Sequence, residues 1–329
     1  MIEKIVSALR KSFLLVFFRN IWLFWVALVY SLLALVLIFG ATALPVVYWV
    51  AAGHHFDPGL LFSRPLEFIL SHWLLIMYSL GGYTVGFILF LVVWLFYHGA
   101  LTAVVTRAVG KLRSAETGRV DSGAFLRDGR TFLSKSAGTA ALAGLLPLPT
   151  LVVMLAVGGI LLIRMAADPT RILMPLSGVT ILLMVAGALT LVATVLLTIL
   201  AVLWYRYSLS AVCADGLSVA QAMLASLKFF GRCWHGVLGL VLASILLSMA
   251  VGGLALPINY GIGLIGNFSE MLELFLKLPG YLLSTVVGVG FDLWMKAALV
   301  VFYIENREPD VRRTIKAQRE MTFMVKPGE

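Results

Sequence analysis

The sequence predicts an all-α integral membrane protein, a polytopic bundle of six transmembrane helices with both termini in the cytoplasm. Hydrophobic residues make up 61% of its 329 residues and charged residues only 12%, whereas a soluble domain carries about 25% charged residues. The charges also fall between long uncharged segments, each long enough for the ~20 residues that cross a bilayer as a helix. These two observations exclude a soluble enzyme, a disordered regulator and a secreted disulfide scaffold.

Six segments are predicted to span the membrane, because a charged side chain in hydrocarbon is costly. They run from Arg19 to Asp57, Glu67 to Arg107, Lys135 to Arg164, Arg171 to Arg206, Arg232 to Glu270, and Leu278 to Ile304. Residues 64–79 and 268–278 are assigned to helices that lie on the membrane surface. The first surface helix is expected to end at Gly81-Gly82 and the second at Pro279-Gly280, since glycine and proline interrupt helices.

The basic residues predict the orientation. Twenty Lys and Arg residues fall in the N-terminus, the loops after the second and fourth spans, and the tail, while four fall on the opposite side. Positive loops stay in the cytoplasm, so both termini are expected there. This asymmetry also accounts for the net charge of +9, and the cytoplasmic segments are too short for a nucleic-acid-binding module. The first apolar run is longer than that of a signal peptide and is read as an uncleaved anchor. Cys213 and Cys233 fall on the reducing side, where no disulfide is expected.

An internal repeat organises the chain. FFRNIW at 17–22 matches FFGRCW at 229–234, and ALPVVY at 43–48 matches ALPINY at 255–260 with the same offset of 212 residues. A weaker copy, residues 120–138, parallels residues 217–235. Each unit is read as an amphipathic cytoplasmic helix followed by a membrane hairpin, which gives three parallel repeats. The units are placed at about 1–115, 116–216 and 217–306 within a single membrane domain, 1–306, followed by a basic cytoplasmic tail, 307–329.

Six spans, amphipathic segments such as SVAQAMLASLKFFGRCW and a basic loop after the second span resemble a broad family of bacterial membrane proteins. That family includes the membrane domain fused to some glycerophosphodiester phosphodiesterases. The resemblance implies a bacterial inner membrane and an envelope or lipid context. It carries over no catalytic residue, because the chain has no phosphodiesterase domain.

Two sets of charged residues stand out within the spans. Asp292 and Lys296 lie four residues apart near the middle of the sixth span, so they project from one helix face. The segments YHGALTAVV at 97–105, YRYSLSAVC at 205–213 and MKAALVVFY at 295–303 align on one leucine, which places His98, Arg206 and Lys296 at one depth. They are read either as an anion site for a lipid phosphate or as side chains that snorkel to the headgroups. Asp292 and Lys296 are likewise read either as functional or as a self-neutralising pair.

Other motifs point to function only weakly. Pro45, Pro147, Pro149 and Pro257 are predicted to kink their spans, which either shapes the bundle or forms the broken helices of a transporter. His54, His55 and Asp57 form an outer-loop trio that suits a metal, yet such a short motif is weak, and no metal or cofactor is expected. No nucleotide-binding or hydrolase motif occurs.

The sequence therefore favours a non-enzymatic inner-membrane protein that binds anionic lipid and serves an envelope-associated or complex-partner role. A transporter or lipid-moving channel that uses the cleft between repeats is the alternative. Membrane lipids are the expected partners, a membrane-protein partner or a second copy of the chain stays open, and nucleic acid is not expected.

Overall fold

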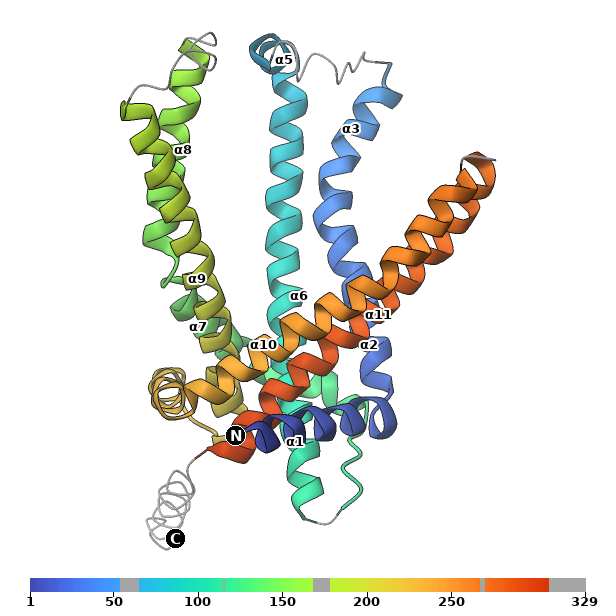
Figure 1. Cartoon of the computed structure of the whole chain (residues 1–329), viewed down its shortest axis with the longest axis vertical. Helices are drawn as coiled ribbons and strands as arrows, with labels where there is room; N and C mark the ends of the chain where they lie inside the picture. The colour runs from blue at the N-terminus through green and yellow to red at the C-terminus, as the bar shows by residue number, and fades with distance from the viewer. Residues whose placement is uncertain (54–64, 115, 168–177, 267–269, 308–329) are drawn as a thin grey trace, which may run out of the picture. The chain divides into compact units, whose positions relative to one another are not determined.

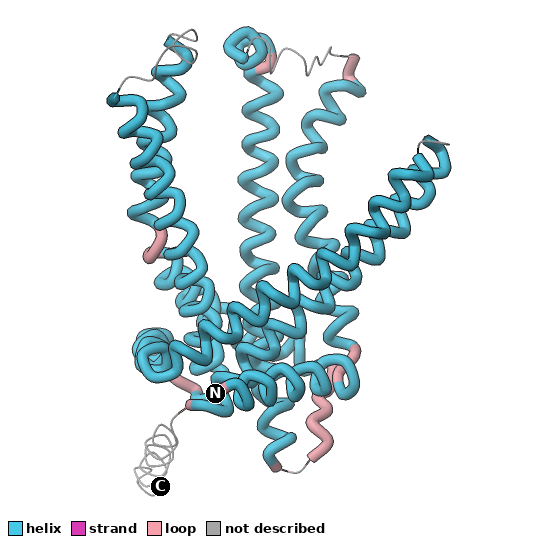
Figure 2. Tube along the Cα trace, viewed as in Figure 1, coloured by secondary structure: helices cyan, strands magenta, loops and turns pink. Residues whose placement is uncertain are grey.

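The structure is a computed structural model that describes residues 1–53, 65–114, 116–167, 178–266 and 270–307. Every regular element in these ranges is helical, as Figure 2 shows. The prediction of an all-α fold is therefore confirmed. The trio His54, His55 and Asp57 and the basic tail from residue 308 onward lie outside the described residues.

The helices follow one another along the chain with short connections (Figure 1). They are α1 (Ile2–Phe13), α2 (Trp22–Leu35), α3 (Ala41–Ala51), α5 (Pro65–Ser71), α6 (Trp73–Arg113), α7 (Gly123–Gly144), α8 (Leu148–Ala167), α9 (Gly178–Asp215), α10 (Val219–Gly266) and α11 (Glu270–Asn306). Two π-helical stretches, Leu14–Arg19 and Val36–Gly40, join α1 to the turn before α2 and α2 to α3.

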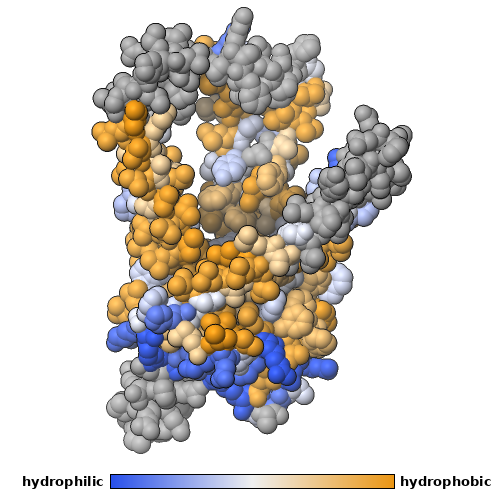
Figure 3. All heavy atoms as spheres, viewed as in Figure 1, coloured by the Kyte–Doolittle hydropathy of each residue, from blue (hydrophilic) through white to orange (hydrophobic). Residues whose placement is uncertain are grey.

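Five of the described helices are long and apolar enough to cross a membrane, namely Trp22–Gly40, Trp73–Arg113, Ile181–Asp215, Val219–Ala250 and Pro279–Asn306. A sixth candidate is the pair Gly123–Gly144 and Leu148–Ile160, which is bent by 53°. Pro147 lies in the turn at this bend and Pro149 in the first turn of α8. The prediction of six spans agrees with the count that takes the bent pair as one span. Figure 3 shows apolar side chains over much of the visible surface and hydrophilic ones gathered near α1.

The backbone contacts divide the chain into two compact units. The first comprises residues 1–133 and 235–302, and within it α3 packs against α6. The second comprises residues 134–234 and 303 onward, and within it α8 packs against α9. The expected single membrane domain and the repeat boundaries stay predictions.

Gly81-Gly82 does not end a helix, so that expectation is wrong. The break falls earlier, at His72, and α6 runs unbroken through both glycines. Glycine is needed here for packing, because a Cβ on Gly82 would collide with the carbonyl oxygen of Ala41, and one on Gly86 with that of Leu37. Pro45 has no N–H to donate to the Ala41 carbonyl four residues earlier, so this oxygen is free to meet α6. Small residues four apart let membrane helices approach in this way.

The surface helix expected at residues 268–278 is likewise wrong as a separate element. Its described part belongs to α11, which continues through Pro279. Proline is tolerated inside a membrane helix where neighbouring groups satisfy the freed backbone carbonyl.

The amphipathic segments predicted from the sequence form α1, α7 and the first part of α10, which we call the lead-in helices. α10 begins with a capping box in which the Ser218 N–H donates to Gln221 Oε1 at 3.3 Å. The lead-in part of α10 ends at a kink at Cys233 (φ −110°, ψ 17°). The lead-in at the N-terminus ends at Asn20 (φ −133°, ψ 51°). With the offset of 212 residues, these two breaks fall one position apart.

The second, fourth and sixth predicted spans lie in α6, α9 and α11, which we call the return helices. Each return helix contacts a lead-in helix. The indole N–H of Trp204 donates to the carbonyl of Met223 at 3.1 Å, and that of Trp294 donates to the carbonyl of Leu9 at 2.9 Å. Phe96 lies against Gly129, where a Cβ would collide with its ring. Phe96, Trp204 and Trp294 each precede one of the aligned segments 97–105, 205–213 and 295–303 by one residue.

Candidate functional site

The three aligned segments of the return helices form the most buried part of the described spans. All nine residues of 97–105 are buried, and so are seven of the nine in each of 205–213 and 295–303. The other four, Arg206, Cys213, Lys296 and Leu299, are partly buried. Ala, Val and Leu pack densely in these segments, together with the buried polar side chains of His98, Thr102, Ser208 and Ser210. By contrast, most residues of α6 between 73 and 92 are exposed. Each return helix therefore has a packed end and an end that is free to face lipid.

Tyr97 joins two of the three residues predicted to form an anion site. It is buried and packs against the ring of His98, with 5.2 Å between ring centroids. The ammonium of Lys296 lies 5.4 Å from the Tyr97 ring centroid, within the range of a cation–π interaction. His98 and Lys296 thus contact the same tyrosine from α6 and α11 within the first unit.

Aromatic rings surround His98. Trp94 meets its imidazole edge-on at 4.7 Å between centroids, Tyr30 approaches at 6.3 Å, and Tyr30 also stacks on Tyr97 at 4.0 Å. His98 is only 1% exposed. This imidazole is held by the aromatic packing around it.

Lys296 and Asp292 form an ion pair along one face of α11. The lysine side chain is 14% exposed and the aspartate side chain 57% exposed. The two members therefore differ in environment, since the ammonium lies against Tyr97 and the carboxylate lies at the surface of the helix.

Arg206, the third predicted member, belongs to the second unit. Its guanidinium carbon lies 6.0 Å from the centroid of the Tyr205 ring. The hydroxyl of Tyr205 is within 2.8 Å of the buried Ser136 Oγ. Tyr205 aligns with Tyr97, because each is the first residue of its aligned segment. In both units a cation lies over this tyrosine.

The second unit also contains a buried ion pair, between Arg307 and Asp215. Tyr303 donates its hydroxyl to the other oxygen of Asp215 at 3.2 Å. Gly216, which follows at φ 70°, ends α9 in the left-handed conformation that favours glycine. Arg232 then donates to the carbonyl of Asn306 at 2.9 Å.

Arg19 makes the corresponding contact in the first unit, where it donates to the carbonyl of Thr117. The buried Asn20 next to it donates to the carbonyls of Leu15 and Gly118 at 3.0 and 3.2 Å and accepts from the Val120 N–H at 2.9 Å. In both units, then, a basic residue near the break that follows a lead-in segment donates to a backbone carbonyl at or shortly after the end of a return helix.

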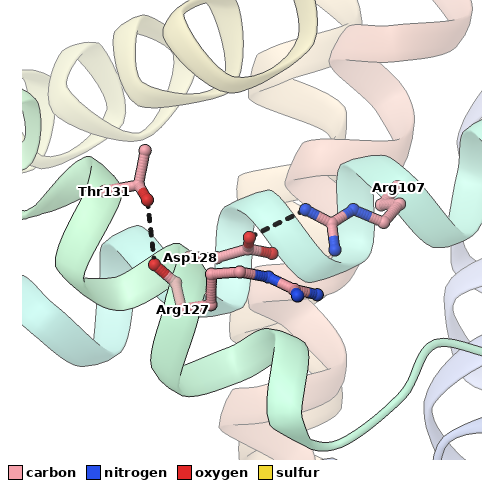
Figure 4. Close-up of polar contacts among 4 residues, drawn as sticks. All are labelled: Arg107, Arg127, Asp128 and Thr131. Carbon is pink, nitrogen blue, oxygen red and sulfur yellow. Dashed lines mark hydrogen bonds and ion pairs between the residues drawn. The ribbon is translucent and has the colours of Figure 1, made fainter.

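Sequence reasoning missed an ion pair between α6 and α7. Arg107 Nη2 lies 2.7 Å from Asp128 Oδ1, and Figure 4 shows this contact with Arg127 beside it. The two partners are 21 residues apart across a loop, so no helical or strand spacing signals the pair. The basic character of the loop was its only visible signal.

No group of three or more His, Cys, Asp or Glu residues that could hold a metal occurs among the described residues. No protein-family model, curated protein or solved structure matches this chain.

Proposed function

We propose that this chain is a non-enzymatic, multi-pass protein of the bacterial inner membrane that binds anionic lipid and serves an envelope-associated or complex-partner role. The apolar helices support integration in a membrane. The bacterial inner membrane rests on the sequence resemblance and on the charge of the loops. The observation that carries the proposal is the densely packed end of the return helices, residues 97–105, 205–213 and 295–303.

A densely packed core of this kind favours a protein that binds lipid over a transporter or lipid-moving channel. A transporter needs polar groups along a path, and intramembrane ionisable residues mark such paths. Within the described aligned segments Lys296 pairs with Asp292 and lies on Tyr97, and Arg206 lies over Tyr205.

The lipid-binding residues are proposed to be His98 and Lys296 in the first unit and Arg206 in the second. The contacts of His98 and Lys296 with Tyr97 support a shared position for two of them, and Arg206 holds the matching position over Tyr205. Arginine and lysine close to the headgroups attract anionic lipid.

We also propose three parallel repeats with both termini in the cytoplasm. Support comes from the contacts of Phe96, Trp204 and Trp294 with Gly129, Met223 and Leu9. In each case the return helix of one proposed repeat contacts the lead-in helix of the next, and the third contacts the first. Ser12 and Ser226 strengthen the comparison, because each donates its hydroxyl to the carbonyl three residues earlier, that of Leu9 and of Met223 respectively.

A transporter or lipid-moving channel is the second candidate. One observation favours it, the 53° bend between Gly123–Gly144 and Leu148–Ile160. Broken helices of this kind form the binding sites of several transporter folds.

Native mass spectrometry in a mild detergent tests the lipid site. The wild-type protein should retain anionic phospholipid, and the folded His98→Ala, Arg206→Ala and Lys296→Met proteins should each retain less. Arg10→Ala serves as the control, because it removes an exposed charge from α1. Equal lipid retention in all five proteins would refute the site.

A further inference from the structure

The beginning of α7 carries a buried carboxylate between exposed arginines. Asp128 is 4% exposed, although its neighbours Arg127 and Arg130 are exposed. A charged group almost never lies this deeply unless it has a partner. Arg107 of α6 is that partner, at 2.7 Å from Oδ1.

The pair fixes the position of the Arg107 side chain without covering it. Arg107 is still 41% exposed, compared with 5% for the Asp128 side chain. The contact joins Nη2 to one oxygen, and a guanidinium has five N–H donors in a rigid fork. Asp128 Oδ2 is buried and has no hydrogen-bond partner among the described residues. Asp128 therefore holds Arg107 through Nη2, and the guanidinium keeps further N–H donors for a ligand.

Arg127 adds a second guanidinium to the same place. Figure 4 shows the side chains of Arg107 and Arg127 extending toward each other from α6 and α7, with both guanidinium groups on the same side of the Asp128 carboxylate in this view. One turn along α7, Thr131 Oγ1 donates to the Arg127 carbonyl at 2.9 Å. Two arginines and one aspartate leave one net positive charge.

We propose that Arg107 and Arg127 bind a phosphate group, with Asp128 as the positioning residue that holds Arg107. Guanidinium forks match the geometry of phosphate oxygens and bind them through paired, charge-assisted hydrogen bonds. The buried Asp128 reduces the side-chain freedom that Arg107 would otherwise lose on binding.

A lipid headgroup is the expected source of the phosphate. Leu126, next to Arg127, is 63% exposed and offers a contact for an acyl chain. Arg107 lies near the end of the candidate span Trp73–Arg113, where a headgroup would be found. The single net positive charge favours phosphatidylglycerol over the zwitterionic phosphatidylcholine. This source rests on the proposed membrane orientation, whereas the phosphate site itself does not.

The test uses the full-length protein in detergent, so that it does not depend on orientation or on the site at His98, Arg206 and Lys296. Short-chain phosphatidylglycerol and phosphatidylcholine are titrated separately, and their dissociation constants are measured by native mass spectrometry. Inorganic phosphate is then added as a competitor. The variants are Arg127→Gln and Arg107→Lys, and the matched control is Arg130→Gln, which removes the same charge three residues along the same helix.

Wild-type protein should bind phosphatidylglycerol more tightly than phosphatidylcholine. Arg127→Gln should weaken phosphatidylglycerol binding roughly tenfold or more, the loss expected for a hydrogen bond to a charged group. Arg107→Lys should also weaken it, because lysine keeps the charge and loses the fork. Arg130→Gln should bind as the wild type does.

Competition identifies the source of the phosphate. Failure of inorganic phosphate to displace the lipid would assign the site to a lipid headgroup. Displacement that depends on Arg127 would assign it to free phosphate. If Arg127→Gln binds phosphatidylglycerol like the wild type, or if Arg130→Gln loses as much affinity, the site does not exist. Thermal stability of Arg127→Gln, whose exposed side chain is not needed for folding, separates loss of binding from unfolding.

Discussion

The indole N–H of Trp294 donates to the backbone carbonyl of Leu9, 285 residues earlier in the chain, at 2.9 Å. This bond joins the last return helix to the first lead-in helix. Trp204 makes the same bond to Met223, which is 19 residues later. The same kind of contact therefore joins two elements that are close in sequence in one case and at opposite ends of the chain in the other, which is what the proposed repeats predict.

Removing the indole donor should destabilise the protein at both places. Trp294→Phe and Trp204→Phe keep an aromatic ring but lose the hydrogen bond, so each should lower the free energy of unfolding by about 1 kcal/mol. Trp25→Phe is the control, because Trp25 is 61% exposed. Thermal unfolding in detergent, followed by circular dichroism, measures the three changes. A Trp294→Phe protein as stable as Trp25→Phe would mean that this bond is dispensable.

The glycines of α6 should differ in their tolerance of a methyl group. Gly86→Ala would place a Cβ against the Leu37 carbonyl and 2.6 Å from the Ala41 Cβ, and should cost about 1–3 kcal/mol through overpacking. Gly81→Ala meets nothing within 4 Å and should be neutral or stabilise the helix by up to about 1 kcal/mol. The unfolding midpoints of the two variants measure this difference in stability. Equal midpoints would show that α6 does not pack closely at Gly86.

These glycines mark the limit of what the sequence could predict. The lengths of the spans follow from charge spacing alone, so the helical class was predicted correctly. A Gly-Gly pair, however, both breaks helices and allows close packing, and only the Ala41 carbonyl on the opposite helix decides between the two.

The candidate sites show the same limit. A leucine register predicts a common depth for His98, Arg206 and Lys296, and this depth stays a prediction. Their contacts with Tyr97 and Tyr205 could not be predicted, because ring orientation has no sequence signal. The two segments related by the offset of 212 residues also differ locally in length. Ser12 and Trp22 are separated by two more residues than Ser226 and Trp234, and the first copy forms a π-helix over Leu14–Arg19 in this interval. A π-helical stretch accommodates inserted residues.

The charge pair on α11 should behave differently in single and double substitutions. Asp292→Leu leaves Lys296 without its carboxylate and should cost about 3 kcal/mol, since an unpaired charge in a low-dielectric site is unfavourable. Combining it with Lys296→Met should restore stability to within about 1 kcal/mol of the wild type. Chemical unfolding of the four proteins gives the coupling energy. If the two losses simply add, Asp292 and Lys296 do not stabilise each other.

Thiol accessibility should report the proposed orientation. Cys213 and Cys233 are both partly exposed and should react in intact cells with a membrane-permeant maleimide but not with an impermeant one. Ala52→Cys, placed at the end of α3 in a background with both native cysteines changed to serine, should react with both reagents. The reverse pattern would invert the topology.

Lipid scrambling in vesicles tests most directly whether the bundle binds anionic lipid without moving it. The purified protein is reconstituted with a fluorescent phosphatidylglycerol, and dithionite then bleaches the label in the outer leaflet. The densely packed segments 97–105, 205–213 and 295–303 predict the same bleached fraction as in protein-free vesicles. If the protein also causes bleaching of the inner-leaflet lipid, the result would contradict a bundle that binds lipid without moving it and would favour the lipid-moving channel.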